Sequence, residues 1–287
     1  MEIMKECIGI IGAGIMGNEL ALTLSACGYY VTIIDINNQK LDASYDYIQK
    51  NLLIYQMQKQ IDKSTNVMQN ITFTLDFDKL EKCLIIFECI AENIPAKLDV
   101  LSTAESICSQ NCILSSNTSC IPIDKLAEGL INKDRLMGTH FFNPVFKMRF
   151  VELIKGKDTD MNMIKKMELF LDSIRISSIQ ISDGPGFISN RLSHVFINEA
   201  AMLVNEGKYS CSQIDTVFKK GYGHTMGPLE TADIIGVDVV VDSLDVLYNE
   251  LKDEKYRCCS LLRNMKENEL FGRKSGKGFY NYFKQEG

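Results

Sequence analysis

Short apolar runs alternate with stretches of helical periodicity through the first two thirds of the chain. Strands are predicted at residues 7–11, 30–35, 71–74, 84–88, 112–115, 135–139, 150–154 and 178–181. A helical pattern over residues 15–27 separates the first two strands, and residues 38–63 have the pattern of a long polar helical hairpin. Strands that alternate with helices form a mostly parallel sheet with helices on both faces. The pattern therefore predicts a doubly wound α/β domain.

The pattern changes at the segment Ser182-Asp183-Gly184-Pro185-Gly186, where glycine and proline interrupt the alternation. Beyond this segment only helical periodicity remains, at residues 187–205, 211–220, 229–248 and 257–270. We therefore predict two domains. A sheet domain covers residues 1–183, and an all-α C-terminal domain covers residues 184–287.

Composition narrows the classes of partner. The net charge of −6 and the isoelectric point near 5.3 argue against nucleic acid. No run of about 18 apolar residues occurs, so we expect no membrane-spanning helix. The ten cysteines are scattered and have no zinc-site spacing. Scattered cysteines without such spacing predict reduced thiols and no metal. The first predicted strand begins at residue 7 and leaves no room for a leader peptide, so we expect a cytoplasmic location.

A glycine-rich loop follows the first predicted strand and opens a helix. Its residues, all candidates for cofactor binding, are Gly12-Ala13-Gly14-Ile15-Met16-Gly17. An acidic residue, Asp35, ends the second strand at the place where dinucleotide-binding Rossmann domains bind a ribose. No arginine follows Asp35, and its charge would repel a 2′-phosphate. The motif therefore predicts NAD rather than NADP. The alternatives are FAD, for which no second signature is present, and a packing loop without a ligand.

His140 and Glu152 are the candidate catalytic pair, in the segment GTHFFNPVFKMRFVELIKG. A histidine near its ordinary pKa is a ready proton acceptor. A carboxylate on the following strand-like run can bind its second ring nitrogen and fix the tautomer. His140 also follows a strand end, at the edge where doubly wound sheets bind ligands. The pair is therefore typical of a general base that removes a hydroxyl proton. We interpret His194 and His224 as structural, with a place for His194 in the cleft as the alternative.

Several stretches together carry a resemblance to a known family. They are IGAGIMGNELA, ECIAENIPAK, SSNTSC, GTHFFNPVFKMRFVELI, DGPGFISNRL, GYGHTMGPLETAD and GRKSGKGFYNY. With these in place the chain resembles the 3-hydroxyacyl-CoA dehydrogenases, and among them the short 3-hydroxybutyryl-CoA dehydrogenases. The resemblance runs nearly from end to end. It implies a Rossmann-type domain, a helical domain that forms a homodimer, and an active site between the two domains.

The resemblance also implies roles for single residues. His140 matches the catalytic base and Glu152 its partner, while Ser119 matches a serine that contacts the reacting oxygen. Asn190 matches an asparagine that contacts the substrate. Alternatives from the residues alone are that Ser119 caps a helix and that Asn190 satisfies backbone groups of its own helix. The further cofactor contacts implied by the resemblance are Glu92, Lys97, Asn117, Asn143 and Lys274.

One departure from the family pattern concerns the acyl carrier. In the polar hairpin, Asn51 and Gln58 stand where the family has a serine and a lysine that hold the CoA nucleotide, and Lys59 is adjacent to Gln58. A missing cation weakens the hold on the CoA 3′-phosphate. The carrier is therefore CoA or, alternatively, the phosphopantetheine of an acyl carrier protein in a polyketide-type pathway.

The function expected from this sequence is the reversible NAD-dependent oxidation of a 3-hydroxyacyl thioester to the 3-ketoacyl thioester. The same reaction on a carrier protein is the second hypothesis. The third is a catalytically silent NAD-binding structural protein, against which the joint presence of Ser119, His140, Glu152 and Asn190 argues.

Overall fold

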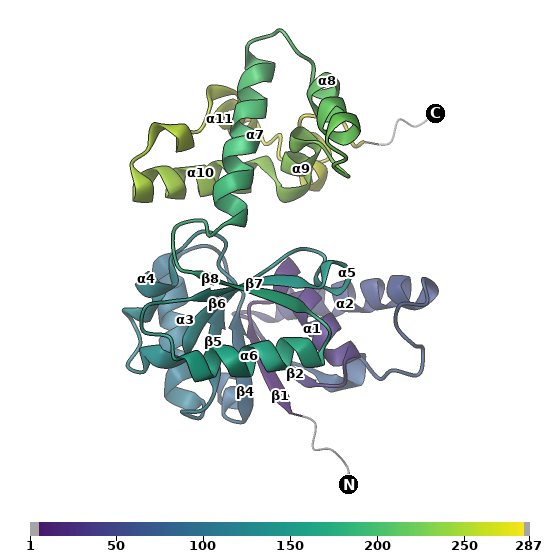
Figure 1. Ribbon diagram of the computed structural model, residues 1–287. Helices are drawn as coiled ribbons and strands as arrows, with labels where there is room; N and C mark the ends of the chain where they lie inside the picture. The colour runs from purple at the N-terminus through teal and green to yellow at the C-terminus, as the bar shows by residue number, and fades with distance from the viewer. Residues whose placement is uncertain (1–5, 284–287) are drawn as a thin grey trace. The chain divides into compact units, whose positions relative to one another are not determined.

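The structure, a computed structural model, describes residues 6–283 and divides into two compact units between Gly184 and Pro185 (Figure 1). The first unit contains an eight-stranded sheet in the order β3-β2-β1-β4-β5-β6-β7-β8. The strands are β1 Cys7–Ile11, β2 Tyr30–Ile34, β3 Ile71–Thr74, β4 Cys83–Glu88, β5 Ile113–Ser116, β6 Leu136–Phe141, β7 Phe150–Lys155 and β8 Ser177–Ser182. All neighbours pair in parallel except β6 and β7. The predicted doubly wound α/β fold is confirmed.

Helices flank this sheet. They are α1 Ile15–Ala26, α2 Asn38–Met57, α3 Ile94–Ile107, α4 Ile123–Ala127, α5 Val145–Met148 and α6 Met161–Ser173, with 3₁₀ turns at Met68–Asn70, Phe77–Leu80 and Lys133–Arg135. Apolar side chains of α1, α2 and α6 share one core cluster with the strands. The central strands are buried on both faces, as in β1, where Ile8 and Ile10 are fully buried. Continuous apolar runs such as CIGII are typical of such strands.

The segment predicted as a helical hairpin differs from the prediction. Residues 38–57 form one helix, α2, and no second helix follows within the predicted range, which ends at residue 63. The helix stops because Lys59 takes a left-handed backbone conformation, with φ of 57°, and the amide of Gln60 bonds back to the carbonyl of Tyr55. The Asp62 carboxylate then accepts bonds from the amide and hydroxyl of Ser64 and holds a turn. The prediction of a hairpin was wrong because local polar turn chemistry ended the helical pattern.

The antiparallel pair β6–β7 positions two candidate residues. Only residues 142–149, which include the short helix α5, connect the two strands. A connection of this length cannot carry the chain back across the sheet for parallel pairing, so the second strand runs in the opposite direction. In the resulting register His140 lies directly opposite Glu152.

The second unit is all-α, as predicted. Its helices are α7 Ser189–Asn205, α8 Cys211–Thr216, α9 Pro228–Ile235, α10 Val237–Leu251 and α11 Ser260–Glu267, with a π-helical turn at Val217–Gly221 and 3₁₀ turns at Glu254–Tyr256 and Arg273–Ser275. The single helix predicted over residues 229–248 is two helices, because Gly236, with φ of 103°, turns the chain between them. The core of this second unit contains Ile197, Val240 and Leu262.

Residues 6–283 contain neither a membrane-spanning helix nor a cluster of metal-ligating side chains. Within that range none of the helices combines the length and apolar character that a bilayer span requires. The same residues contain no group of three or more His, Cys, Asp or Glu side chains arranged to hold a metal ion.

Candidate active site

The facing strands β6 and β7 bring a histidine and a glutamate together. Nδ1 of His140 lies 2.8 Å from Oε2 of Glu152, and the two residues are 7% and 3% exposed. Because a carboxylate only accepts, Nδ1 carries the shared proton and Nε2 is the basic nitrogen. His140 is the next-to-last residue of β6, which runs parallel to β5. It therefore lies at the carboxyl edge of the parallel sheet, where doubly wound folds bind ligands.

The turn after β5 is tied to the same edge. The side-chain oxygen of Asn117 accepts a bond of 3.1 Å from the amide of Phe141, the residue after His140. The amide of Asn117 in turn donates to the carbonyl of Glu88 at the end of β4. Asn117, predicted as a cofactor contact, thus links three adjacent strand ends. These bonds place the turn that carries Ser119 next to the strand that carries His140.

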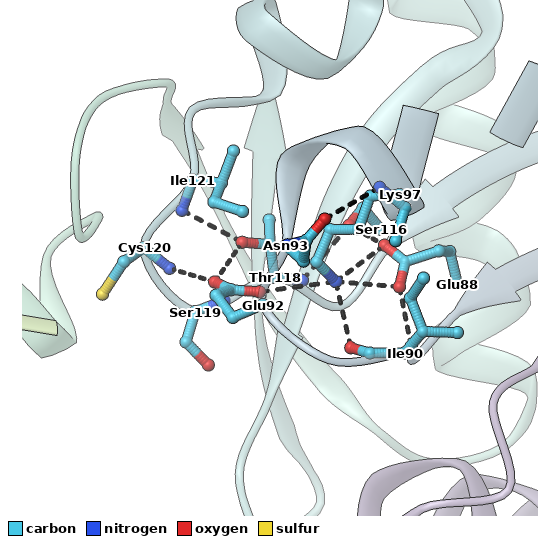
Figure 2. Close-up of polar contacts among 11 residues, drawn as sticks. Glu88, Ile90, Glu92, Asn93, Lys97, Ser116, Thr118, Ser119, Cys120 and Ile121 are labelled. Carbon is cyan, nitrogen blue, oxygen red and sulfur yellow. Dashed lines mark hydrogen bonds and ion pairs between the residues drawn. The ribbon is translucent and has the colours of Figure 1, made fainter. Parts of the chain in front are cut away.

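Glu92 holds the backbone of that turn. Its Oε1 accepts bonds from the hydroxyl of Thr118 at 2.5 Å and from the amides of Ser119 and Cys120 at 2.9 and 3.0 Å (Figure 2). Burial by itself would raise the pKa of Glu92, but the ammonium of Lys97 and these three donors lower it below its ordinary value. Figure 2 shows the Ser119 hydroxyl pointing away from Glu92, so the carboxylate fixes the backbone and leaves the side chain directed elsewhere.

Lys97 is buried beneath this turn. Its ammonium lies 2.8 and 2.9 Å from the two carboxylate oxygens of Glu88, 3.2 Å from the carbonyl of Ile90 and 3.4 Å from Glu92 (Figure 2). The sequence predicted Glu92 and Lys97 as cofactor contacts, and the structure brings them together. Sequence reasoning missed Glu88. The available signal was an acidic residue closing the apolar run CLIIF, with a lysine nine positions later.

The glycine-rich loop has the shape that a dinucleotide requires. Gly12 has φ of 110°, and a Cβ there would lie 2.7 Å from the backbone of Cys89. A Cβ at Gly17 would lie 1.9 Å from the carbonyl oxygen of Gly12, so only glycine lets α1 pack this closely. Nothing lies within 4 Å of a Cβ built on Gly14, which leaves open space over the start of α1. An unobstructed loop at a helix N-terminus fits a pyrophosphate.

Asp35 directly follows β2 and contacts the glycine-rich loop at Ala13. Its two oxygens accept bonds from the amides of Ala13 at 2.8 Å and Ile36 at 2.7 Å, and Lys40 lies 3.5 Å away. Each carboxylate oxygen has a second lone pair with which to accept a ribose hydroxyl. The loop residues and Asp35 therefore fit NAD. Ile15 is largely exposed and Met16 half-buried at the start of α1.

Three of the remaining candidates belong to the first unit and two to the second. In the first unit, Asn51 donates to the carbonyl of Tyr47 within α2, Gln58 is exposed at the end of that helix, and Asn143 is exposed after β6. In the second unit, Lys274 pairs with Asp238 at 2.5 Å. Asn190 lies in the first turn of α7, and its carbonyl is 2.9 Å from Nδ1 of the buried His194.

Comparisons with known proteins agree with this arrangement. The model of the 3-hydroxyacyl-CoA dehydrogenase NAD binding domain matches residues 7–184, and that of the C-terminal domain of the same family matches residues 186–282. A relative from Bacillus subtilis, named a probable 3-hydroxybutyryl-CoA dehydrogenase, is 36% identical over 284 residues, which are 98% of each chain. A 3-hydroxybutyryl-CoA dehydrogenase of Clostridioides difficile is 33% identical over 279 residues, which are 96% of this chain and 99% of its own.

A solved structure of a 3-hydroxybutyryl-CoA dehydrogenase is also similar to this chain in fold and sequence. The (S)-3-hydroxybutyryl-CoA dehydrogenase of Ralstonia eutropha superposes with a TM-score of 0.90 at 34% identity, over 98% of this chain and 100% of that chain. The resemblance seen in the sequence motifs is therefore confirmed, and so is NAD as the expected cofactor.

Proposed function

This chain belongs to the 3-hydroxyacyl-CoA dehydrogenase family, and from that premise we propose that it interconverts (S)-3-hydroxybutyryl-CoA or a similar short thioester and its 3-keto form. The observation that carries the proposal is the 2.8 Å contact between His140 and Glu152 at the carboxyl edge of the sheet. A buried imidazole held by a carboxylate is a suitable acceptor for the proton of a secondary alcohol.

The residues have the following parts in the reaction. Nε2 of His140 takes the proton of the 3-hydroxyl, and Glu152 stabilises the imidazolium that results. The Ser119 hydroxyl bonds the substrate oxygen as its charge changes, and Asn190 is a further substrate contact. NAD, when bound, supplies the ring that accepts hydride from C3. In the reverse direction the imidazolium returns its proton to the forming alkoxide.

The cofactor contacts follow from the loop and the edge of the sheet. The amides at the start of α1 would hold the pyrophosphate, and Asp35 would accept from the adenosine ribose. Glu92 would contact the nicotinamide half, with Asn143 and Lys274 as further contacts. A catalytically silent NAD-binding protein is the alternative to this function, and measured turnover distinguishes the two.

The acyl carrier is CoA. Gln58 weakens the binding of CoA, because it stands where the family has a lysine that holds the nucleotide. Gln58 and Lys59 are both exposed where α2 ends. We expect Gln58→Lys to lower the KM for acetoacetyl-CoA by about threefold, since an exposed cation opposite a phosphate contributes about 1 kcal/mol or less. The kcat should not change, because the contact is the same in the ground and transition states. Initial rates of NADH oxidation measure both constants.

Acetoacetyl-pantetheine is the control, because it lacks the nucleotide and its KM should be the same for both proteins. An unchanged KM for acetoacetyl-CoA would show that Gln58 does not face the nucleotide. If acetoacetyl-CoA is inert and an acetoacetyl carrier protein reacts, the carrier-protein enzyme replaces the proposed function.

The assembly is a homodimer formed through the helical unit. Large apolar side chains are exposed there, among them Leu192, Val217 and Tyr222, at 67%, 56% and 70%. Exposed apolar surface of this kind is typical of subunit interfaces.

The ten cysteines fit a location in the reducing cytoplasm. None of them forms a disulfide in the described residues.

A further inference from the structure

Two glutamates and one lysine form a charged cluster at the end of β4. Glu88 is fully buried, Lys97 is 1% exposed, and the side chain of Glu92 is 36% exposed. Buried charges are costly unless they are paired and hydrogen-bonded. The cluster carries one more carboxylate than it has ammonium groups, at the edge of the sheet where His140 also lies. Each charged group of this cluster is paired or hydrogen-bonded within the protein.

Glu88 joins three segments of the chain. Its Oε1 accepts from the amide of Ile90 at 2.7 Å, and its Oε2 accepts from the Ser116 hydroxyl at 2.5 Å. Both oxygens also accept from Lys97 on α3. The turn after β4, the end of β5 and the first turns of α3 are therefore held by a single carboxylate. No donor outside the protein is needed to satisfy it.

The ammonium of Lys97 is committed to protein acceptors. It has three N–H donors, and its neighbours are the Glu88 carboxylate, the Ile90 carbonyl at 3.2 Å and Glu92 at 3.4 Å. Figure 2 shows these contacts surrounding the nitrogen. A lysine held in this way acts on its neighbours rather than on a ligand. Its effect on the site passes through Glu92.

Glu92 transmits that effect to the backbone that carries Ser119. One of its oxygens faces Lys97, and the other accepts the amides of Ser119 and Cys120. We propose that Glu88 is a positioning residue of the dehydrogenase reaction, which fixes the Ser119 turn through Lys97 and Glu92. This inference rests on the proposed role of Ser119 at the substrate oxygen.

The physical consequence of losing the Glu88 charge is a change in the partners of Lys97. The ammonium then keeps one carboxylate, Glu92, and draws it away from the amides of Ser119 and Cys120. A displacement of about 1 Å in a group that bonds the reacting oxygen can cost about 10²-fold in rate. A purely structural role predicts something else, namely lower stability with unchanged chemistry.

A double-mutant cycle with Glu88→Gln and Ser119→Ala separates these roles. If Glu88 acts by placing Ser119, Glu88→Gln should lower kcat/KM by about tenfold or more in the wild type. In the Ser119→Ala background the same substitution should cost less than about twofold, because no hydroxyl remains to be misplaced. Equal losses in the two backgrounds, or no loss in the wild type, would overturn the proposal.

The matched control is Glu105→Gln. Glu105 is also a buried glutamate of the same unit, and it accepts the amides of Ile131 and Asn132 and lies 3.6 Å from Arg135. It holds a loop before β6, at the opposite end of that strand from His140. Glu105→Gln should lower the melting temperature and leave kcat/KM within about twofold. If it lowers kcat/KM as much as Glu88→Gln, the specific role of Glu88 is contradicted.

A milder variant keeps the test decisive if Glu88→Gln does not fold. Ser116→Ala removes one donor to Glu88 and the hydroxyl that accepts the Thr118 amide, and it leaves the ion pair between Glu88 and Lys97. It should lower kcat/KM by a smaller factor, and again only where Ser119 is present. An equal loss in both backgrounds overturns the proposal. A wild type that turns over no 3-hydroxyacyl thioester would instead overturn the proposed function.

Discussion

Glu152 sets the orientation of the His140 imidazole, which we propose as the catalytic base. The strand register sets the two side chains opposite each other, and the 2.8 Å contact directs Nδ1 toward the carboxylate. Because Nδ1 carries the proton shared with the carboxylate, Nε2 is the proposed acceptor of the substrate proton. We therefore expect the reaction rate to depend on the charge of Glu152 as well as on its shape.

The substitution Glu152→Gln removes the charge of the side chain and keeps its shape, so it tests whether the reaction needs the charge. The amide oxygen can still accept the proton on Nδ1, so the ring keeps its orientation, but the charge that stabilises the imidazolium is lost. We expect kcat for 3-hydroxybutyryl-CoA oxidation to fall by about 10²-fold, the lower end of the contribution of a general base. Steady-state NADH formation provides the measurement. A variant as fast as the wild type would reduce Glu152 to a packing role.

The sequence predicted those elements of the first unit that belong to a known local motif, such as the strand, loop and helix of a dinucleotide-binding domain. The apolar run CIGII, the glycine loop and Asp35 follow one another as in a dinucleotide-binding domain, and the pairing of His140 with Glu152 followed from an acidic residue on the next strand. The antiparallel pairing of β6 with β7 depends on the shortness of the connection between them.

Elements whose ends depend on backbone conformation were less predictable. The left-handed conformation of Lys59 ended α2, and that of Gly236 divided one predicted helix into two. The contacts of Glu88 were missed, because its partners Lys97 and Ser116 come from elements that meet only in the folded sheet. Apolar periodicity places strands and helices but does not identify side-chain partners.

The turn held by Glu92 should respond to acid. Burial by itself raises the pKa of Glu92, but Lys97 and the turn donors lower it below its ordinary value of 4.5. A carboxylate with a lowered pKa in the folded chain stabilises the fold above the unfolded pKa, and this contribution is lost as pH falls through the folded pKa. We expect Glu92→Gln to be less stable than the wild type at pH 7, with a difference that shrinks below pH 4.5.

Urea unfolding of both proteins over a series of pH values measures that difference. The comparison between the two proteins removes the acid sensitivity that they share. A difference that stays constant or grows as the pH falls below 4.5 would contradict the lowered pKa of Glu92.

At the scale of the whole molecule, the exposed apolar side chains of the helical unit are the basis for predicting a homodimer. Ile188 and Leu192 near the start of α7 are 50% and 67% exposed, and Met202 near its end is 44% exposed. We expect a homodimer at micromolar concentration, with twice the mass of the 32.4 kDa chain. Light scattering coupled to size-exclusion chromatography measures this mass directly. A particle of 32.4 kDa across the concentration range would contradict the homodimer.

We propose His140 as the base in an NAD-dependent oxidation of a 3-hydroxyacyl thioester. The most direct test is the rate of NADH formation from (S)-3-hydroxybutyryl-CoA and NAD, compared between the wild type and His140→Gln. We expect turnover by the wild type, and a kcat about 10²- to 10⁴-fold lower in the variant with nearly unchanged NAD affinity. Near-wild-type turnover by His140→Gln, or a wild type that forms no NADH, would contradict it.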